Sequence, residues 1–387
     1  MTIPARRVRR RVPRRRLVAA AAVLAVGGLV LASCAGGTEE TDAAPTASAS
    51  VSPSSAPSAT APSAAPSVVP QGAPATVAGD LAAPWSVAVV GEAVLVSERD
   101  TGDIREVVGD TTRVVGSVPG VVFGGEGGLL GIAADGDDGL FVYSTGSGGN
   151  RVERFALTGA PGSLAFGEAA TVLDGIPSAR THNGGRIALG PDGMLYVTAG
   201  DANVSDLAQD LDSLAGKILR MTPEGAVPDD NPFPDSLVYS YGHRNPQGIA
   251  WAEDGTLFAS EFGQNTWDEL NVITPGANYG WPTVEGQGGG AGFVDPVQQW
   301  GTAEASPSGI AVIEGTVFIA NLRGERVRAV PLADPSTATE YYVGEFGRIR
   351  DVVAAPDGDL WILTNNTDGR GAGPRDGDDR LLAVTVG

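Results

Sequence analysis

The chain has 387 residues, of which 42% are hydrophobic and 19% are charged, and it contains 55 glycines and 27 prolines. Its 46 acidic residues outnumber its 26 basic residues and give a net charge of −20, which argues against a nucleic-acid partner because phosphate repels an acidic surface. A single cysteine excludes any disulfide within the chain.

Residues 1–34 have the three parts of an export signal: eight arginines, an apolar run from Leu17 to Leu31, and the sequence Leu-Ala-Ser-Cys at 31–34. The apolar run is shorter than the roughly 20 residues of a membrane span, so a transmembrane anchor or a nucleic-acid-binding arm is the lesser alternative. The last four residues resemble the lipobox of bacterial lipoproteins, which implies cleavage before Cys34 and lipidation of its thiol. We therefore expect an exported protein whose lipidated Cys34 anchors it to the outer face of the cytoplasmic membrane, with no other membrane contact. Removal of the eight arginines would leave 18 basic and 46 acidic residues, a net charge of −28.

Residues 35–76 consist mainly of Ala, Pro, Ser and Thr. Such a segment cannot bury enough apolar surface to offset its conformational entropy. It is predicted to be a disordered spacer, and residues 77–387 are predicted to form the folded domain.

The folded part contains six copies of one pattern, in which two short apolar runs flank a turn that often contains Asp-Gly. The copies begin at Ser86, Gly131, Arg186, Gly248, Gly309 and Val352. Asp-Gly suits a tight hairpin turn because the turn needs positive φ. The spacing, roughly 40 to 60 residues, is that of a four-stranded propeller blade. We therefore predict an all-β fold, a six-bladed β-propeller, with a pair of β-sandwiches as the alternative.

The two histidines lie in equivalent loops just before repeated segments. His182 precedes the third copy and His243 the fourth. Histidine is the natural general base near neutral pH, although a single loop histidine is more often a hydrogen-bonding residue. Both are candidates for a site on the face of the propeller where these loops meet.

Two further segments carry charged groups that could bind ligands. The turn-rich segment 260–282 contains Glu261, Asp268 and Glu269, whose oxygens could bind calcium or could simply be solvated. Arg348 and Arg350 are two residues apart, so on a strand they share one face and could hold an anion.

The motifs between and within these repeats resemble one known family. They are "EGGLLGIA", "HNGGRIALGPDGMLYVTAGD", "AQDLDSLAGKILRMTPEGAVPDDNPF", "YGHRNPQG" and "DELNVITPGANYGWP". Together they resemble the soluble pyrroloquinoline-quinone (PQQ) dependent sugar dehydrogenases, the glucose/sorbosone dehydrogenase group that includes aldose sugar dehydrogenases. The resemblance implies a six-bladed propeller that oxidises an aldose sugar to a lactone with PQQ and Ca²⁺. The sugar and the electron acceptor remain open.

The resemblance also implies roles for individual residues. His182 matches the catalytic base, and the backbone carbonyls of Gly263 and Gln264 match ligands of the calcium ion beside PQQ. A second, structural calcium ion uses the positions of Glu269 and Tyr279. The residues that match cofactor contacts are Glu126, His182, Arg244, Asn245, Phe262, Arg323, Arg348 and Arg350.

Four positions depart from the family pattern. Phe262 replaces a usual Gln or His, Gln264 a usual Pro, Arg323 a frequent Lys, and Glu126 a frequent Gln. Glu126 would bring a carboxylate near an anionic cofactor, and Gln264 would remove the rigidity of proline. These departures keep two other functions open: a non-catalytic propeller that binds a sugar or a protein, and a calcium-dependent, lactonase-like hydrolase.

Overall fold

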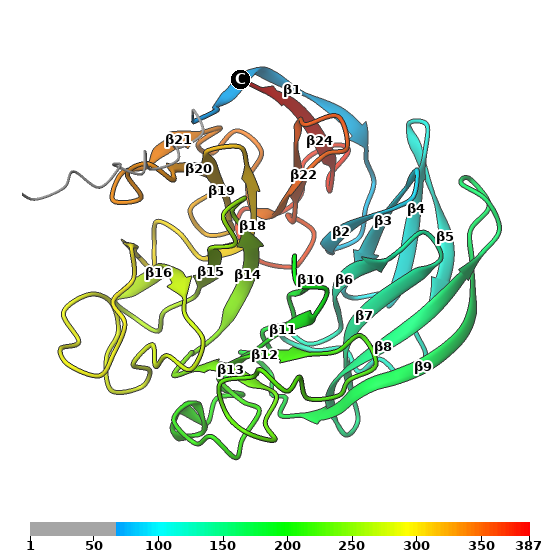
Figure 1. The fold of residues 1–387 in the computed structure, drawn as a ribbon. Helices are drawn as coiled ribbons and strands as arrows, with labels where there is room; N and C mark the ends of the chain where they lie inside the picture. Colours follow the sequence, from blue (N-terminus) through cyan, green and yellow to red (C-terminus); the bar gives the residue numbers. More distant parts are fainter. Residues whose placement is uncertain (1–66) are drawn as a thin grey trace, which may run out of the picture. The chain divides into compact units, whose positions relative to one another are not determined.

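The computed structural model describes residues 67–387, whose strands form six four-stranded sheets arranged as the blades of a ring (Figure 1). The predicted six-bladed β-propeller is confirmed. The predicted signal, Cys34 and most of the predicted spacer lie outside the described residues. Within residues 67–387, no helix is long and apolar enough to cross a bilayer.

Each blade is an antiparallel sheet whose strands follow one another from the axis outward. The first three blades are β2 (Pro84–Val90), β3 (Ala93–Glu98), β4 (Asp103–Val108) and β5 (Thr111–Ser117); β6 (Leu129–Asp135), β7 (Gly139–Gly146), β8 (Gly149–Thr158) and β9 (Ala165–Ile176); β10 (Ile187–Leu189), β11 (Leu195–Ala199), β12 (Lys217–Met221) and β13 (Val238–Tyr241). The last three are β14 (Pro246–Trp251), β15 (Leu257–Glu261), β16 (Trp267–Ile273) and β17 (Gln298–Gly301); β18 (Pro307–Ile313), β19 (Thr316–Asn321), β20 (Arg326–Pro331) and β21 (Thr339–Tyr341); β22 (Ile349–Ala354), β23 (Leu360–Thr364), β24 (Leu381–Val386) and β1 (Pro70–Ala78).

The repeated pattern in the sequence corresponds to the two inner strands of every blade. In the third blade the turn between β10 and β11 contains Asp192 and Gly193, and Gly193 has a φ of 76°. The Asp192 carboxylate accepts a hydrogen bond of 3.1 Å from the backbone of Met194, which fixes the turn. Asp-Gly therefore marks the inner hairpin of this blade, whereas the corresponding turns of the first and fifth blades contain Gly91-Glu92 and Glu314-Gly315.

The last blade is closed by the first strand of the chain. β1 supplies the outermost strand and pairs antiparallel with β24, with Pro70 opposite Val386. The propeller therefore begins before residue 77, the predicted start. The sequence of β1, PQGAPATVA, contains few large β-forming residues. Its composition therefore resembles that of the spacer, to which most of the strand was assigned.

The hydrophobic core is divided into six clusters, one at each interface between neighbouring blades. Between the first two blades, for example, Leu95 and Ile104 pack with Leu140 and Phe155. Because both faces of each sheet are buried in this way, the strands read as continuous apolar runs. The ring also leaves the inner strands of all six blades around one axis, and this places the loops that precede them together.

Candidate active site

The sequence-predicted residues gather on one face of the ring, around its axis. His182 lies in the loop before β10, Arg244 and Asn245 lie just before β14, and Arg348 lies just before β22, on which Arg350 follows. Because inner strands of neighbouring blades lie side by side around the axis, the segments that precede them converge (Figure 1). The fold thus joins positions that are far apart in the sequence.

The imidazole of His182 lies between the side chains of Asp201 and Arg244. Its Nδ1 lies 2.7 Å from Oδ1 of Asp201, and its Nε2 lies 2.8 Å from Nη2 of Arg244. An arginine can only donate, so Nε2 accepts, and Nδ1 carries the proton that Asp201 accepts. The residue has a φ of 62°, a strained conformation for a non-glycine residue of the kind often found at functional sites. The neutral imidazole therefore presents a lone pair on Nε2.

Asp201 is the functional residue that sequence reasoning missed. Besides His182, it accepts hydrogen bonds from the backbone of Asn203 at 2.8 Å and from Nε1 of Trp281 at 2.9 Å. Burial raises the pKa of Asp201, but its hydrogen bonds, led by that of His182, outweigh burial and lower the pKa below the ordinary value. The carboxylate is therefore ionised at neutral pH. The available signal was the motif VTAGD, in which an acid directly follows the second strand of a blade.

Arg244 connects the histidine to the loop after β15. Its Nη1 donates to the carbonyl oxygens of Gly263 at 2.6 Å and Phe262 at 3.1 Å, and its guanidinium lies 5.5 Å from the centre of the Trp281 ring. Burial lowers the pKa of Arg244, while the nearby acids oppose that effect. A cation thus faces the same space as the His182 lone pair, where it can stabilise a developing negative charge.

Four buried donors on this face have no hydrogen-bond partner within the described part of the chain. They are Nε of Arg244, Nδ2 of Asn245, Nε of Arg348 and Nε of Arg350. Buried polar groups in proteins are almost always paired, so unpaired donors indicate a missing acceptor. All four belong to residues that sequence reasoning assigned to the cofactor. A planar, oxygen-rich anion such as PQQ fits this donor set.

The two arginines of the last blade are anchored at their other atoms. Nη2 of Arg348 lies 3.1 Å from the Asp368 carboxylate, and Nη1 of Arg350 lies 2.9 Å from Oε1 of Gln247. Burial lowers the pKa of Arg350 to about 9. An anion that bound here would offset the desolvation of this guanidinium.

Glu126 is hydrogen-bonded to the site residues, whereas Arg323 is not. One oxygen of Glu126 accepts the backbone N–H of His182 at 2.9 Å, and the other lies 3.4 Å from Nη1 of Arg370. The carboxylate therefore positions the histidine and has a cationic partner, which offsets the repulsion expected near an anionic cofactor. Arg323 is exposed in the turn between β19 and β20, apart from the hydrogen bonds that join the other residues.

The loop that carries Phe262, Gly263 and Gln264 is held by an acid rather than by proline. Oε1 of Glu285 accepts four consecutive backbone N–H groups of residues 264–267, the shortest at 2.6 Å from Gln264. A proline at 264 could not donate that bond. Phe262 is half-buried in this loop. Gly263 approaches the Trp267 carbonyl so closely that a Cβ on residue 263 would lie 1.7 Å from that oxygen.

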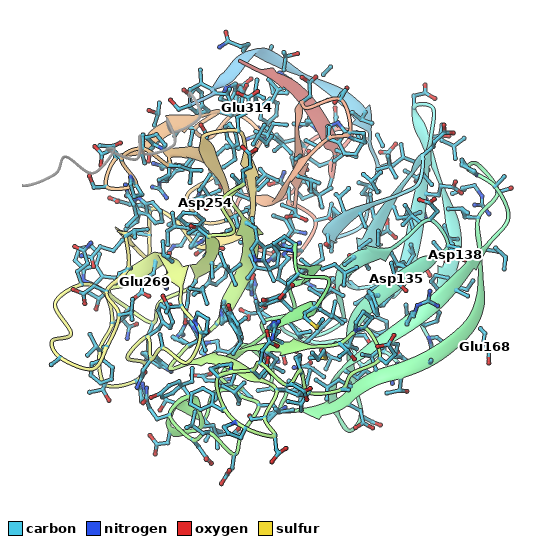
Figure 2. All side chains as sticks on the ribbon, in the orientation of Figure 1. Asp135, Asp138, Glu168, Asp254, Glu269 and Glu314 are labelled. Atoms are coloured by element: carbon cyan, nitrogen blue, oxygen red, sulfur yellow. The ribbon has the colours of Figure 1, made fainter. Side chains whose placement is uncertain are left out.

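Glu269, which Figure 2 labels, lies on β16. It pairs with Glu261 of β15, so two buried carboxylates are cross-strand neighbours. Burial, reinforced by Glu261, raises the pKa of Glu269 to about 8. Both acids, with Tyr279, border a small cavity of about 10 Å³. No cluster of three or more His, Cys, Asp or Glu side chains in residues 67–387 is arranged as a metal site. A cation here would have to use backbone oxygens beside the carboxylates.

His243 has a structural environment. It is fully buried, with Nε2 at 2.8 Å from Oγ of Ser240 and Nδ1 at 2.8 Å from Oε2 of Glu261. Its ring stacks on Tyr279 with 4.7 Å between ring centroids. The equivalent loop positions of the two histidines therefore lead to different roles.

Comparison with known proteins identifies relatives with the same architecture. A family model described as Glucose / Sorbosone dehydrogenase matches residues 81–373. Quinoprotein glucose dehydrogenase B of Acinetobacter calcoaceticus is 32% identical over 52% of this chain and 50% of its own length, and aldose sugar dehydrogenase YliI of Escherichia coli is 35% identical over 51% and 62%. The chain thus matches about half of the first relative's length.

Among solved structures, the PQQ-bound form of aldose sugar dehydrogenase from Streptomyces coelicolor superposes with a TM-score of 0.78. It is 49% identical, and the match covers 84% of this chain and 100% of that one. An apo-form structure of the soluble aldose sugar dehydrogenase from E. coli has a TM-score of 0.69 at 27% identity, covering 81% of this chain and 99% of that one.

Proposed function

The chain belongs to the glucose/sorbosone dehydrogenase family, and on this premise we propose that it oxidises aldose sugars at the anomeric carbon to lactones, with PQQ and Ca²⁺. The observation that carries the proposal is the arrangement of His182 between Asp201 and Arg244, beside four unpaired buried donors. A non-catalytic binding propeller has no need of an imidazole held in one tautomer.

The reaction needs a base for the hydroxyl proton and an acceptor for the hydride on the same carbon. Nε2 of His182 would accept the proton of the anomeric hydroxyl, and Asp201 would stabilise the imidazolium that results. The C1–H bond breaks with its electron pair while the C1–O bond becomes a carbonyl, so the sugar loses two electrons and two hydrogens in total. PQQ, when bound, would supply the hydride acceptor. A sugar hydroxyl would take the place on Nε2 that Arg244 now occupies.

Residues of this chain would hold the cofactor from several sides. Arg348 and Arg350 would pair with its carboxylates, and Asn245 would donate from Nδ2. Arg244 would stabilise negative charge on the quinone oxygens. Phe262 would provide an apolar surface, and Arg323 would add positive charge at the rim. The buried, unpaired donor atoms of Arg244, Asn245, Arg348 and Arg350 support the assignment of these four residues.

We extend the proposal to calcium at two sites. The carbonyl oxygens of Gly263 and Gln264 would bind the ion beside the cofactor, with the ion taking the place that Arg244 now occupies on the Gly263 carbonyl, and a Lewis acid there would polarise the quinone. The carboxylate of Glu269 and the carbonyl of Tyr279 would bind a structural ion. The raised pKa of Glu269 supports this, because burial opposes ionisation unless a cation compensates.

The location is part of the same proposal. We propose that the protein is exported and anchored at the outer face of the cytoplasmic membrane by lipid on Cys34. The signal-like composition of residues 1–34 supports it. An extracytoplasmic enzyme of this kind would meet free sugars, and its physiological electron acceptor would be a separate partner.

Reconstitution tests the function directly. The purified protein is loaded with PQQ and CaCl₂, and reduction of an artificial dye is followed with a panel of aldoses. His182→Gln should lower kcat by about 10²–10⁴-fold, because a general base contributes that much. PQQ affinity, measured separately by absorbance titration, should change little.

Three outcomes separate the components of the proposal. Wild-type protein that binds no PQQ in saturating calcium would contradict the cofactor assignment. Binding without sugar oxidation would favour a binding propeller. Full activity of His182→Gln would leave the dehydrogenase in place and show that another group is the base.

A further inference from the structure

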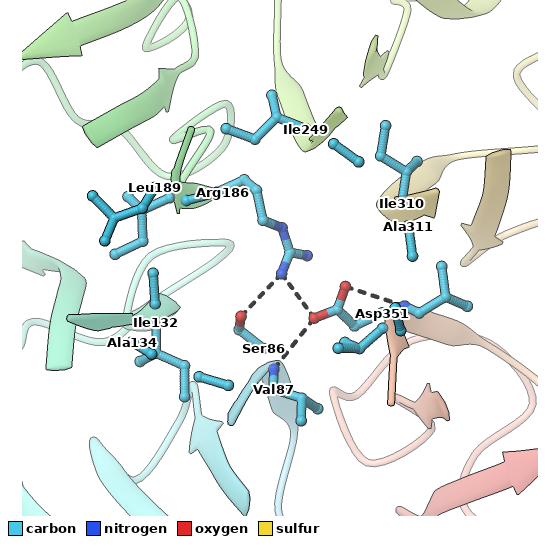
Figure 3. Close-up of a pocket in the computed structure, with 18 of the residues that line it drawn as sticks. Ser86, Val87, Ile132, Ala134, Arg186, Leu189, Ile249, Ile310, Ala311 and Asp351 are labelled. Atoms are coloured by element: carbon cyan, nitrogen blue, oxygen red, sulfur yellow. Dashed lines mark hydrogen bonds and ion pairs between the residues drawn. The ribbon is translucent and has the colours of Figure 1, made fainter. Parts of the chain in front are cut away.

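A second cavity lies on the axis of the propeller, on the far side from His182. It has a volume of about 570 Å³ and is lined by the inner strands of all six blades (Figure 3). Most of the active-site residues precede these strands, whereas the cavity is lined, apart from Arg186, by residues farther along the chain, towards the opposite face. The volume is within the range of small-molecule sites.

The wall of this axial cavity is apolar except at its inner end. Its apolar side chains come from all six blades, among them Val87, Ile132, Leu189, Trp251, Ile310 and Val352. The polar side chains are Ser86, Arg186 and Asp351, which Figure 3 shows gathered together. A ligand would therefore be apolar over most of its surface and polar at one end.

Arg186 leaves one donor for that polar end. Its Nη1 donates to Oγ of Ser86 at 3.0 Å and to Oδ2 of Asp351 at 2.8 Å, and its Nε donates to the carbonyl of Gln247 at 2.9 Å. The side chain is 8% exposed. Its Nη2 is buried and has no partner within the described residues, and in Figure 3 it carries no dashed line. Such a donor requires an acceptor.

The charges at this end decide which acceptor fits. The guanidinium of Arg186 is neutralised by the Asp351 carboxylate, and no other charged side chain among residues 67–387 lines the cavity. An anionic ligand would meet both the cation and the repelling carboxylate, and it would also lose its hydration in an apolar channel. A neutral carbonyl oxygen satisfies Nη2 without that penalty.

We propose that the axial cavity binds a neutral ligand with an apolar ring and a carbonyl oxygen, the chemistry of a quinone, and that Nη2 of Arg186 donates to that oxygen. The rigid ring would lose little conformational entropy in a narrow channel. The cavity lies on the far side from the proposed catalytic face, and its inner end adjoins that face at Gln247, which accepts hydrogen bonds from both Arg186 and Arg350. The arginines of the catalytic face differ from Arg186, because several of their donors are unpaired and Asp351 does not neutralise their charge.

Calorimetry with three matched compounds tests the chemistry of the site in the purified protein. Duroquinone has the ring and the carbonyl, durene has the same methylated ring without oxygen, and tetramethylbenzoate carries an anion. Duroquinone should bind about tenfold more tightly than durene, as one buried hydrogen bond predicts. Equal affinity of duroquinone and durene, or tighter binding of the benzoate, would overturn the proposal.

Two variants test the location. Arg186→Lys keeps the charge opposite Asp351 but removes the forked donor, so duroquinone affinity should fall about tenfold while durene affinity is unchanged. Ala134→Phe reduces the volume of the cavity and should abolish binding of both compounds. Ala169→Phe, on the exposed outer strand β9, is the control and should have no effect. Retained duroquinone binding in Ala134→Phe would overturn the assignment to this cavity even if Arg186→Lys does not fold.

Discussion

Asp201 holds the imidazole of His182 in the tautomer in which Nε2 carries no proton. Asp201→Asn removes the charge that stabilises the imidazolium and offers an amide that can reverse the hydrogen bond. We expect kcat with an aldose to fall by about 10²–10⁴-fold, close to the loss of the base itself. The change in PQQ affinity should be small.

Asp206→Asn is the matched control for this change. Asp206 lies in the same loop but is exposed, so the same substitution there should leave kcat unaltered. A fully active Asp201→Asn variant would show that the carboxylate only packs the loop. Thermal melting of both variants separates that structural effect from loss of catalysis.

Single residues show where sequence reasoning reaches its limit. His182 and Arg244 were predictable because each lies inside a distinctive motif. Asp201 and Glu285 were not assigned, because each acts through a contact that only the folded chain creates: Asp201 meets Trp281 across 80 positions, and Glu285 meets the backbone of the loop at 264–267. The departure at Gln264 predicted a less rigid loop, but the carboxylate of Glu285 fixes the loop instead.

At the scale of the strand, the inner hairpins were predictable and the outer strands were not. The inner strands are buried on both faces and read as apolar runs, with Asp-Gly between them in most blades. β9 is largely exposed over its 12 residues, and β1 has few β-forming side chains, so neither carries a periodic signal. The start of the domain was consequently placed too late.

The segment that leads into β1 is attached to the neighbouring blade by one threonine. Oγ1 of Thr316 accepts the backbone N–H of Val68 at 3.0 Å and donates to its carbonyl at 2.9 Å. Thr316→Val keeps the shape and leaves two buried backbone groups unpaired. The free energy of unfolding should fall by about 1–3 kcal/mol in urea denaturation.

Thr339→Val, on the exposed edge strand β21, is the control and should change the free energy by less than about 0.5 kcal/mol. If Thr316→Val is as stable as the wild type, these two hydrogen bonds add nothing to stability, and the closing strand is held by its pairing with β24 and by the packing of Val68 against the neighbouring blade.

The negative charge of the whole molecule favours binding of the proposed calcium ion. The excess of acidic residues is large, and the pair Glu261 and Glu269 is buried within it. Calcium that binds only the folded state stabilises it by linkage, so excess EDTA should lower Tm and added CaCl₂ should restore it. Glu269→Gln should abolish most of this calcium dependence, because it replaces the carboxylate that would bind the ion. An unchanged Tm in metal-free wild-type protein would exclude the structural site.

The last prediction concerns where the molecule resides, and it depends on residues that the structure does not describe. If Cys34 is the lipidated first residue of the mature protein, mass spectrometry of the membrane fraction should show a diacylglyceryl adduct on it. Cys34→Ser should shift the protein from the membrane to the soluble fraction, since one removed lipid anchor leaves only an acidic domain that anionic headgroups repel. Sugar oxidation by the isolated propeller should be unaffected, because the catalytic residues lie within 126–350 and the chain closes on itself through β1 and β24. A Cys34→Ser protein that is processed normally and still sediments with membranes would show that another segment holds it there.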